Sequence, residues 1–309
     1  MRTISLRQNI IIVLGFLILF IGSHWMAPHS LQAENTYWYQ KLQRLQMWRY
    51  LYLMPDPNFT YAVPRSDIPL DVVIPVVEKD LNVLPLCIKS ARDMIMHPIG
   101  KIYVVAPESA KIREVAAALN AIFVLEDVVL PQFTQPKAKK MRGWLIQQYV
   151  KLNADTFVDS QNYLVIDADT MFIRPQVFLH KGKTIFNIHT DYSLSRKQMV
   201  KEALGVDKFY QIDFTVHHMV MNKAKMQQLK SALQALHNKK WFDALNELHA
   251  EDFSEYELYA NFFLHKYPNQ IRIVAARNVW IPRERIGAFE GLRAALSKDY
   301  KSLSMHIFQ

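Results

Sequence analysis

The sequence predicts an α/β fold in which helices cover both faces of a mostly parallel sheet. Three observations favour this class. Half of the residues are hydrophobic, the apolar runs are short and rich in β-branched side chains, and helical stretches of about ten residues separate them. Strands buried on both faces of a sheet have such continuous runs. One large domain after an N-terminal extension accounts for the 309 residues.

The strongest strand signals are the apolar runs DVVIPVV at 71–77, KIYVVA at 101–106 and YLVID at 163–167. Helical stretches separate them, which is the pattern of βαβ units. In chain order we expect strand 71–77, helix 84–96, strand 101–106, helix 110–119, strand 121–125, helix 143–156, strand 163–167, a strand-like and irregular region at 185–222, and helices at 223–237, 241–249 and 254–265.

The first 67 residues are predicted to form a membrane anchor and a stem, followed by a soluble domain at 68–309. Residues 10–22 are apolar and uncharged; this is short for a span of about 20 residues, but residues 5–27 extend the run. A cleaved signal peptide is the alternative, with LQA at 31–33 as its cleavage site. We expect an uncleaved, single-pass anchor and therefore a membrane localisation.

The segment after the apolar run mixes aromatic and basic residues. Residues 37–54 are typical of a helix lying in the lipid headgroup layer, and an ordinary helix packed on the domain is the alternative. The sequence PDPN at 55–58 breaks the pattern and marks a linker. Membrane topology stays open, because Arg2 and Arg7 favour a cytoplasmic N-terminus and Lys41 and Arg44 favour the reverse.

Composition excludes several classes of protein. The chain has no GxGxxG and no GxxxxGK[ST] loop, so a dinucleotide fingerprint and a P-loop are unsupported. Cys87 is the only cysteine, which excludes an intrachain disulfide and a cysteine-rich zinc site; its apolar surroundings indicate an inert core thiol. The net charge of +9 is compatible with nucleic acid, anionic lipid or nucleotide phosphates, and charge alone does not choose between them.

Two aspartates directly follow the apolar run at 163–166. Asp167 and Asp169 are separated by Ala168 alone. Ligands of open α/β sheets gather at the carboxyl ends of strands, and two carboxylates spaced i, i+2 in a turn can hold one hard cation. Mg²⁺ or Mn²⁺ at such a site neutralises the charge of a departing diphosphate. A structural turn is the alternative, and we interpret Asp155 and Asp159 as solvated turn residues of that kind.

A basic segment precedes the aspartates. Residues 134–151 include Lys137, Lys139, Lys140, Arg142 and Lys151 and contain no acid. A basic segment that leads into a helix suits a diphosphate, through its charge and through the free N–H groups at the helix start. Nucleic-acid binders instead spread basic groups over a wide face and interleave aromatics, so we expect no nucleic-acid partner.

At this point the residues resemble a known superfamily. The order DVVIPV, KIYVVAP, GWLIQQYVKL, YLVIDADTMF and a terminal SMHIF is similar to the GT-A (Rossmann-like) superfamily of nucleotide-sugar glycosyltransferases. The segment GWxxQQxxKL ahead of the DxD is similar to a group of uncharacterised bacterial glycosyltransferase-like domains. The resemblance covers residues 68–309, which it makes a catalytic domain, and it implies a nucleotide-sugar donor and a glycan or lipid-linked acceptor.

The resemblance implies where the donor binds. The first strand and its loop hold the base and ribose, and the helix that opens at Gly143 faces the same ligand. The donor-binding residues so implied are Pro75, Val76, Lys79, Asp80, Arg142, Trp144, Gln147, Gln148, Lys151 and Asp167. A solvated turn is the alternative for Lys79 and Asp80, and core packing is the alternative for Trp144.

The resemblance also implies a metal shell of Asp167, Asp169 and His306, because several GT-A families complete it with a late histidine. Imidazole suits Mn²⁺ better than Mg²⁺. His306 as a structural residue is the alternative, and His217 and His218 are alternative ligands or line the acceptor cleft.

An inverting reaction needs a general base beside the acceptor hydroxyl. Besides Asp169 we name Glu255 and Asp213 as catalytic candidates, and we favour Glu255 because Ser254 can cap the helix that Glu255 opens. A purely structural capping box of Ser254 and Glu257 is the alternative. The function expected is metal-dependent glycosyl transfer. The alternatives are an inactive GT-A-like domain that binds nucleotide or glycan, and a peripheral phosphate or nucleic-acid binder.

Overall fold

A five-stranded sheet forms the centre of the described chain. The computed structural model describes residue 45 and residues 47–131, 143–189, 193–208, 213–248 and 253–306. The strands are β1 (Leu70–Pro75), β2 (Ile99–Ala106), β3 (Ile122–Leu125), β4 (Asn162–Ile166) and β8 (His218–Asn222), in the order β3-β2-β1-β4-β8. The first four run parallel and β8 pairs antiparallel with β4. The predicted α/β class with a mostly parallel sheet is confirmed.

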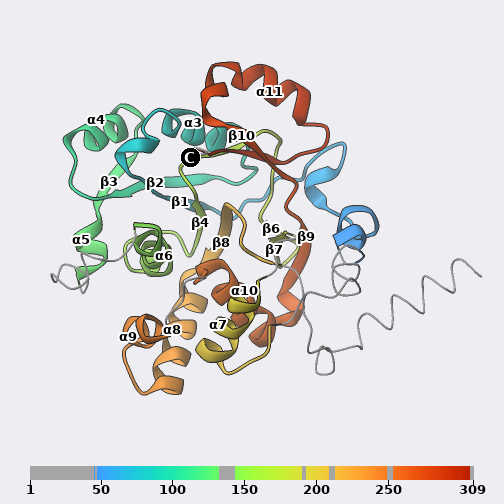
Figure 1. Cartoon of the computed structure of the whole chain (residues 1–309). Helices are drawn as coiled ribbons and strands as arrows, with labels where there is room; N and C mark the ends of the chain where they lie inside the picture. Colours follow the sequence, from blue (N-terminus) through green and yellow to red (C-terminus); the bar gives the residue numbers. More distant parts are fainter. Residues whose placement is uncertain are drawn as a thin grey trace, which may run out of the picture.

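Helices cover both faces of this sheet, as Figure 1 shows. On one face lie α3 (Leu84–Met94) and α4 (Ala110–Ala118), and on the other lie α6 (Gly143–Asn153), α8 (Lys223–His237), α9 (Trp241–Glu247) and α10 (Glu255–Lys266). Because side chains alternate along a strand, Val72 and Ile74 of β1 pack into the first layer and Val73 packs into the second. All three are fully buried, which explains why β1 is apolar throughout its centre.

Two three-stranded sheets complete the described fold. One has the order β10-β11-β5 and consists of β10 (Asn278–Pro282), β11 (Ser302–His306) and β5 (Thr170–Phe172); the other has the order β6-β7-β9 and consists of β6 (Leu179–His180), β7 (Lys183–Ile188) and β9 (Ile271–Ala275). Strand β5 follows β4 after a three-residue turn, and it pairs antiparallel with β11. This pairing brings the C-terminal part of the chain against the turn after β4. Two further helices are α5 (Glu126–Val129) and α11 (Phe289–Leu296).

The region 185–222 departs from the prediction. It contains β7 and β8, but residues between them form α7 (Leu194–Leu204) rather than irregular strand. The Ser193 hydroxyl accepts the Arg196 N–H at the helix start, and Gly205 ends the helix with φ of 69°. Met199 and Val200 bury their side chains in the large core. A cap residue at each end was the signal that the prediction missed.

The segment before β1 packs into the domain. Residues Arg49–Leu53 form one turn of π-helix whose Tyr50 belongs to the large core, and Pro57–Phe59 form a 3₁₀ turn. Asn58 is fully buried; its side chain accepts the Val177 N–H at 2.7 Å and donates to the Val177 carbonyl at 3.1 Å. Residues 47–59, which belong to the segment predicted to be a stem and linker, therefore contact the domain that begins at residue 68.

The predicted anchor at residues 10–22 lies outside the described residues. None of the helices among the described residues has the length and the apolar character that crossing a membrane requires.

Candidate active site

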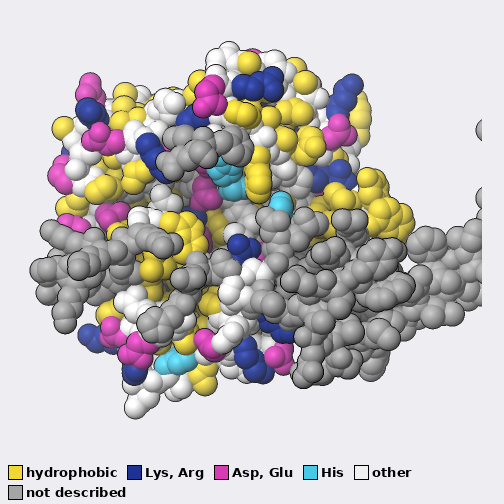
Figure 2. Space-filling model, in the orientation of Figure 1, with side chains coloured by type: hydrophobic (Ala, Val, Ile, Leu, Met, Phe, Trp, Pro, Cys, Tyr) yellow, Lys and Arg dark blue, Asp and Glu magenta, His cyan; other side chains and the backbone are white. Residues whose placement is uncertain are grey.

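The carboxyl ends of β1 and β4 open into a cavity of about 380 Å³. A cleft at this end of a parallel sheet is where α/β proteins bind ligands. Figure 2 shows acidic and histidine side chains side by side near the centre of this face. Most of the predicted site residues line the cavity: Pro75, Lys79, Asp80, Trp144, Gln147, Gln148, Lys151, Asp167, Asp169, Glu255 and His306.

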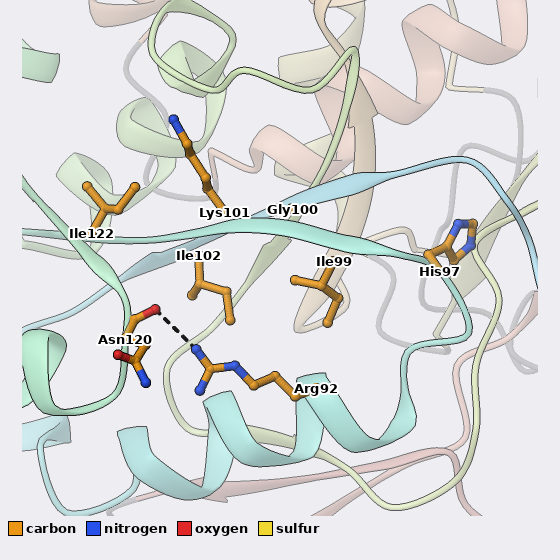
Figure 3. Close-up of a pocket in the computed structure, with 8 residues that line it drawn as sticks. All are labelled: Arg92, His97, Ile99, Gly100, Lys101, Ile102, Asn120 and Ile122. Atoms are coloured by element: carbon orange, nitrogen blue, oxygen red, sulfur yellow. Dashed lines mark hydrogen bonds between the residues drawn. The ribbon is translucent and has the colours of Figure 1, made fainter.

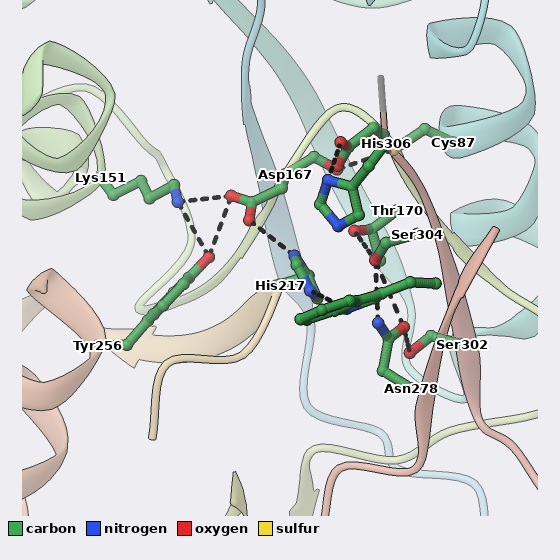
Figure 4. A network of polar contacts seen from close by, with 12 residues as sticks. Cys87, Lys151, Asp167, Thr170, His217, Tyr256, Asn278, Ser302, Ser304 and His306 are labelled. Atoms are coloured by element: carbon green, nitrogen blue, oxygen red, sulfur yellow. Dashed lines mark hydrogen bonds and ion pairs between the residues drawn. The ribbon is translucent and has the colours of Figure 1, made fainter. Parts of the chain in front are cut away.

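Asp167 is held between a lysine and a histidine. It follows β4, and its backbone N–H donates to the His217 carbonyl at 2.9 Å. Its Oδ1 lies 2.5 Å from Lys151 Nζ, and its Oδ2 lies 3.3 Å from His217 Nδ1 (Figure 4). Burial alone would raise the pKa of Asp167, but the charge of Lys151 and the contact with His217 outweigh it and hold the pKa well below its usual range. Asp167 is therefore ionised at neutral pH.

Lys151 connects Asp167 to the start of α10. Its buried ammonium lies 2.7 Å from Glu255 Oε1 and 3.1 Å from the Tyr256 hydroxyl. Burial would lower the pKa of Lys151, but the charges of Asp167 and Glu255 raise it well above its usual value. The Gln148 side chain, one turn earlier on α6, accepts the Glu255 N–H at 2.9 Å. Gln148 and Lys151 thus face the same site, as their spacing on the helix predicts.

Glu255 lines the cavity but is not freely accessible. Its residue is 2% exposed, and burial raises its pKa although Lys151 opposes this shift. The Ser254 hydroxyl accepts the Glu257 N–H at 3.3 Å, which is the capping arrangement the sequence predicts for this helix start. Only the backbone N–H of Glu257 contacts Ser254 in this cap. The Glu255 carboxylate takes no part in the cap and is directed at Lys151.

Asp169 lies on the other side of the turn, next to the last strand. Its carbonyl accepts the Met305 N–H at 2.8 Å, and its Oδ2 lies 3.4 Å from His306 Nδ1. Burial and the nearby charge of Asp167 raise the pKa of Asp169 to about 6. Burial and the neighbouring His217 lower the pKa of His306. The pairing of β5 with β11 therefore brings a residue 137 positions away beside the DxD turn.

The guanidinium group of Arg283 brings a positive charge to the site, and the sequence did not predict it. It donates to Asp80 Oδ1 at 2.9 Å and to the Lys79 carbonyl at 2.8 Å, and its Nη2 lies 3.7 Å from Asp169 Oδ2. Asp80 is buried by this contact, so the alternative of a solvated turn is wrong for Asp80, whereas Lys79 is exposed. Because no motif surrounds Arg283, only the packing of its turn against the loop after β1 identifies it.

Three predictions about single residues do not agree with the structure, and a fourth, for Arg142, is not tested by it. Val76 is buried in the core with α3 and does not line the cavity. Asp213 is fully buried against Arg196 and Lys208 and lies outside the cavity, so it does not offer an acceptor the access that a general base needs. Asp155 is a buried partner of Lys230 rather than a solvated turn residue. Arg142 lies outside the described residues.

A second cavity of about 430 Å³ lies at the opposite ends of the strands, between α3 and β2 (Figure 3). Its one arginine, Arg92, donates to the carbonyls of Leu119 and Asn120 at 2.8 and 3.1 Å, and Lys101 points away from it on the other side of β2. No cluster of titratable groups accompanies this arginine among the residues that line the cavity. We therefore assign no site to it.

The donor set in the first cavity has the chemistry of a metal site. Two carboxylates and an imidazole, from Asp167, Asp169 and His306, are ligand types that suit Mn²⁺. Across the described ranges, however, no group of three or more His, Cys, Asp or Glu side chains is arranged closely enough to hold a metal ion. Lys151 and Arg283 supply the positive charges that stand beside the two aspartates.

Fold and site together define an α/β protein with a charged cleft at the carboxyl ends of its parallel strands. The chain belongs to DUF6492, a family of unknown function, whose model matches residues 69–279. That range includes Lys151, Asp167, Asp169 and Glu255 and ends before Arg283. No curated protein matches the sequence.

Several solved structures are similar to this one at low sequence identity. The galactosyltransferase LgtC in complex with donor and acceptor sugar analogs has a TM-score of 0.44 and 15% identity, over 76% of this chain and 87% of that one. Mouse xyloside xylosyltransferase 1 in its apo form has a TM-score of 0.44 and 12% identity, over 77% and 97%. An active-site mutant of LgtC has a TM-score of 0.45 and 15% identity, over 76% and 87%. At these values the similarities assign no activity to this chain.

Proposed function

We propose that this protein is a glycosyltransferase of the GT-A type, which moves a sugar from a nucleotide-diphosphate donor to a glycan or lipid-linked acceptor. One observation carries the proposal: Asp167 and Asp169 follow a central parallel strand, and both line a cavity that also has basic residues along it. An anionic ligand bound by a cation and by basic side chains fits this arrangement, and a nucleoside diphosphate is such a ligand.

The proposal places the nucleotide at the end of β1. Pro75, Lys79 and Asp80 line the cavity there, and Arg283 fixes the loop by its bonds to Asp80 and to the Lys79 carbonyl. The Lys79 side chain is exposed, so its ammonium can meet a phosphate without a desolvation penalty like that of a buried lysine. The diphosphate then extends along the cavity towards the two aspartates.

A divalent cation, Mn²⁺ or Mg²⁺, is part of this proposal, and the side chains after β4 would have to close around it, because they are not arranged closely enough in this structure. The supporting argument is electrostatic: burial and, after it, the charge of the neighbouring Asp167 raise the pKa of Asp169, so a cation between the two carboxylates offsets part of their repulsion. Asp167, Asp169 and His306 would hold it. When bound, the cation offsets the negative charge that develops on the departing nucleoside diphosphate.

The chain's own residues orient these groups. Lys151 holds one oxygen of Asp167 from the α6 side, and His217 contacts the other, so the carboxylate plane is restrained from both sides. If the reaction inverts the anomeric carbon, we propose Glu255 as the general base, because its carboxylate lines the cavity beside this network. Asp213 is not proposed for this role, because it is fully buried and lies outside the cavity. The anomeric configuration of the product tests this role: inversion requires such a base, and retention does not.

Cation-dependent donor hydrolysis tests the proposal. The purified full chain is incubated with a panel of UDP-, GDP- and dTDP-sugars, and nucleoside diphosphate is measured with Mn²⁺, with Mg²⁺ and with EDTA. We expect release from at least one donor with Mn²⁺ and a fall to about one hundredth or less with EDTA. Nucleotide binding without turnover of any donor would make the inactive GT-A-like domain the better description. Salt-sensitive RNA or DNA binding without nucleotide binding would contradict both.

We also propose that the protein acts at a membrane. The first support is the apolar run at residues 10–22 of the sequence. The second comes from the described residues: the side chains of Tyr52, Leu53 and Met54, in the segment before β1, are 68, 55 and 36% exposed. Exposed aromatic and aliphatic side chains next to a predicted anchor suit the lipid interface.

Vesicle flotation measures this second proposal. We expect the full chain to float with vesicles that contain anionic lipid. For a chain that lacks residues 1–44, the fraction bound to the vesicles should fall about ten-fold or more. Replacing Tyr52 and Leu53 with aspartate in the shorter chain should remove the remaining bound fraction. Equal flotation of the full and shortened chains would contradict the anchor.

A further inference from the structure

We propose that Trp280 is the platform on which the sugar ring of the acceptor stacks, so that the acceptor ends in a pyranose. This inference rests on the proposed function and names the substrate class of its second site. Trp280 belongs to β10, is 50% exposed, and donates its indole N–H to His217 Nε2 at 3.3 Å. A tryptophan is usually largely buried, so a half-exposed ring held against a cleft residue needs an explanation.

The register of β10 on β11 places Trp280 on the face of the small sheet that carries His306, next to the residues that line the cleft but not among them. Val279 and Ile281 pair with Leu303 and Met305 and pack into the cluster under α11. Side chains alternate, so Trp280, which pairs with Ser304, lies on the opposite face, next to His306. The ring centroids of Trp280 and His306 are 5.6 Å apart at an interplanar angle of 83°.

The same register separates Trp280 from the nucleotide end of the cleft. Pro282 pairs with His306, and the next residue, Arg283, bonds Asp80 in the loop after β1. Trp280 lies two residues further back along β10, beside His217 rather than beside the loop after β1. A donor bound along the loop after β1 and the DxD turn therefore leaves Trp280 for the second substrate.

The ring is already fixed before any ligand binds. His189 stacks nearly parallel to it, with ring centroids 6.2 Å apart and an interplanar angle of 12°. Asn278, on the same strand as Trp280, donates to Ser304 Oγ at 3.1 Å, and Ser304 Oγ contacts Thr170 Oγ1 at 3.0 Å (Figure 4). These two contacts hold β10 to β11 and β5. A platform with little freedom to lose binds its ligand at a low entropic cost.

The chemistry around the ring suits a sugar better than a lipid tail or a peptide. One face of a pyranose presents C–H groups, which pack on the π-face of an indole, and its rim presents hydroxyls. Polar rather than apolar side chains border the ring, because His217 accepts its N–H and the His306 ring lies 5.6 Å away, and such surroundings suit the hydroxyl rim of a sugar. A single aromatic residue surrounded by polar groups offers too little apolar area for an acyl chain.

Direct binding tests the inference independently of turnover. The full chain with UDP and Mn²⁺ is titrated with the methyl β-pyranosides of galactose, glucose, N-acetylglucosamine and xylose by calorimetry or saturation-transfer NMR. We expect at least one of them to bind, Trp280→Ala to raise its Kd about ten-fold or more, and Trp280→Phe to stay within about three-fold of the wild type, because phenylalanine keeps the π-face. Trp48→Ala, which removes a tryptophan of 41% exposure from the segment before β1, far along the chain from β10, is the matched control and should not change Kd.

Four outcomes would overturn the platform. The wild type binds none of the four pyranosides; Trp280→Ala binds them as the wild type does; Trp280→Phe loses binding as Ala does, which would assign the role to the N–H bond with His217; or Trp280→Ala weakens UDP binding instead, which would make the ring a base platform. Pyranoside binding that depends on Trp280, in a protein that hydrolyses no nucleotide sugar, would reject the proposed transferase and retain the sugar platform.

Discussion

Replacing Asp169 with asparagine is expected to lower kcat/KM for sugar transfer by about 10³-fold, or roughly 4 kcal/mol of transition-state stabilisation. Asparagine keeps the shape of the side chain and removes the negative charge that stands beside His306 and Arg283. Mn²⁺-dependent nucleotide binding should weaken in the same variant. The measurements are initial rates on the donor identified by the panel and calorimetric titration of its nucleoside diphosphate with and without Mn²⁺.

The fold should survive this change. Burial and the charge of Asp167 raise the pKa of Asp169 to about 6, above its value in an unfolded chain. A carboxyl group with a raised pKa contributes stability at low pH that is lost as the pH rises through about 6, so its ionised form is unfavourable at pH 7.5. The asparagine variant should therefore be as stable as the wild type or more stable at pH 7.5, and this gain should vanish below about pH 4.

Asp159→Asn is the matched control. Asp159 is exposed, pairs with Lys101 at 2.5 Å at the other end of the sheet, and does not line the cleft. It should change neither the rate nor nucleotide binding. Wild-type rates in Asp169→Asn, or an equal loss of rate in Asp159→Asn, would remove the role assigned to the DxD turn.

The second large effect is expected from the segment before β1. Asp56→Ala should lower the free energy of unfolding by about 3–5 kcal/mol, because it leaves the buried ammonium of Lys301 without its carboxylate. Lys301 is fully buried, with Asp56 Oδ2 at 3.1 Å and Asn187 Oδ1 at 2.6 Å, and burial lowers its pKa. Urea denaturation of the full chain, followed by near-UV circular dichroism, measures the change.

A second substitution distinguishes the ion pair from general damage. In the double variant Asp56→Ala, Lys301→Met, no buried charge is left alone, so most of the lost stability should return. Asp93→Ala, which breaks the exposed pair with Lys89 at 2.7 Å, should cost less than about 1 kcal/mol. If Asp56→Ala costs no more than Asp93→Ala, residues 49–59 do not stabilise the domain, and a division near residue 67 describes the chain better.

The fold class was predictable because burial leaves a mark on single strands. The runs at 71–77, 101–106 and 163–167 became β1, β2 and β4, since a strand covered on both faces has to be apolar along its length. Helix 223–237 was predicted to the residue. Helix α7 was missed because its sequence is mostly polar, and its identity depended on the caps at Ser193 and Gly205.

Sequence alone determined the parts of the site that lie close together along the chain. Asp167 and Asp169 follow a strand directly, and Gln148 and Lys151 share one helix face, so their common direction is a property of local geometry. Only the tertiary structure decided the rest. His217 reaches Asp167 through the antiparallel pairing of β8 with β4. Arg283 and Trp280 reach the site through the pairing of β10 and β11 with β5, and the buried pair of Asp56 with Lys301 forms through the packing of residues 49–59. None of these contacts leaves a periodic pattern in the sequence, because each depends on which surfaces meet when the whole chain folds.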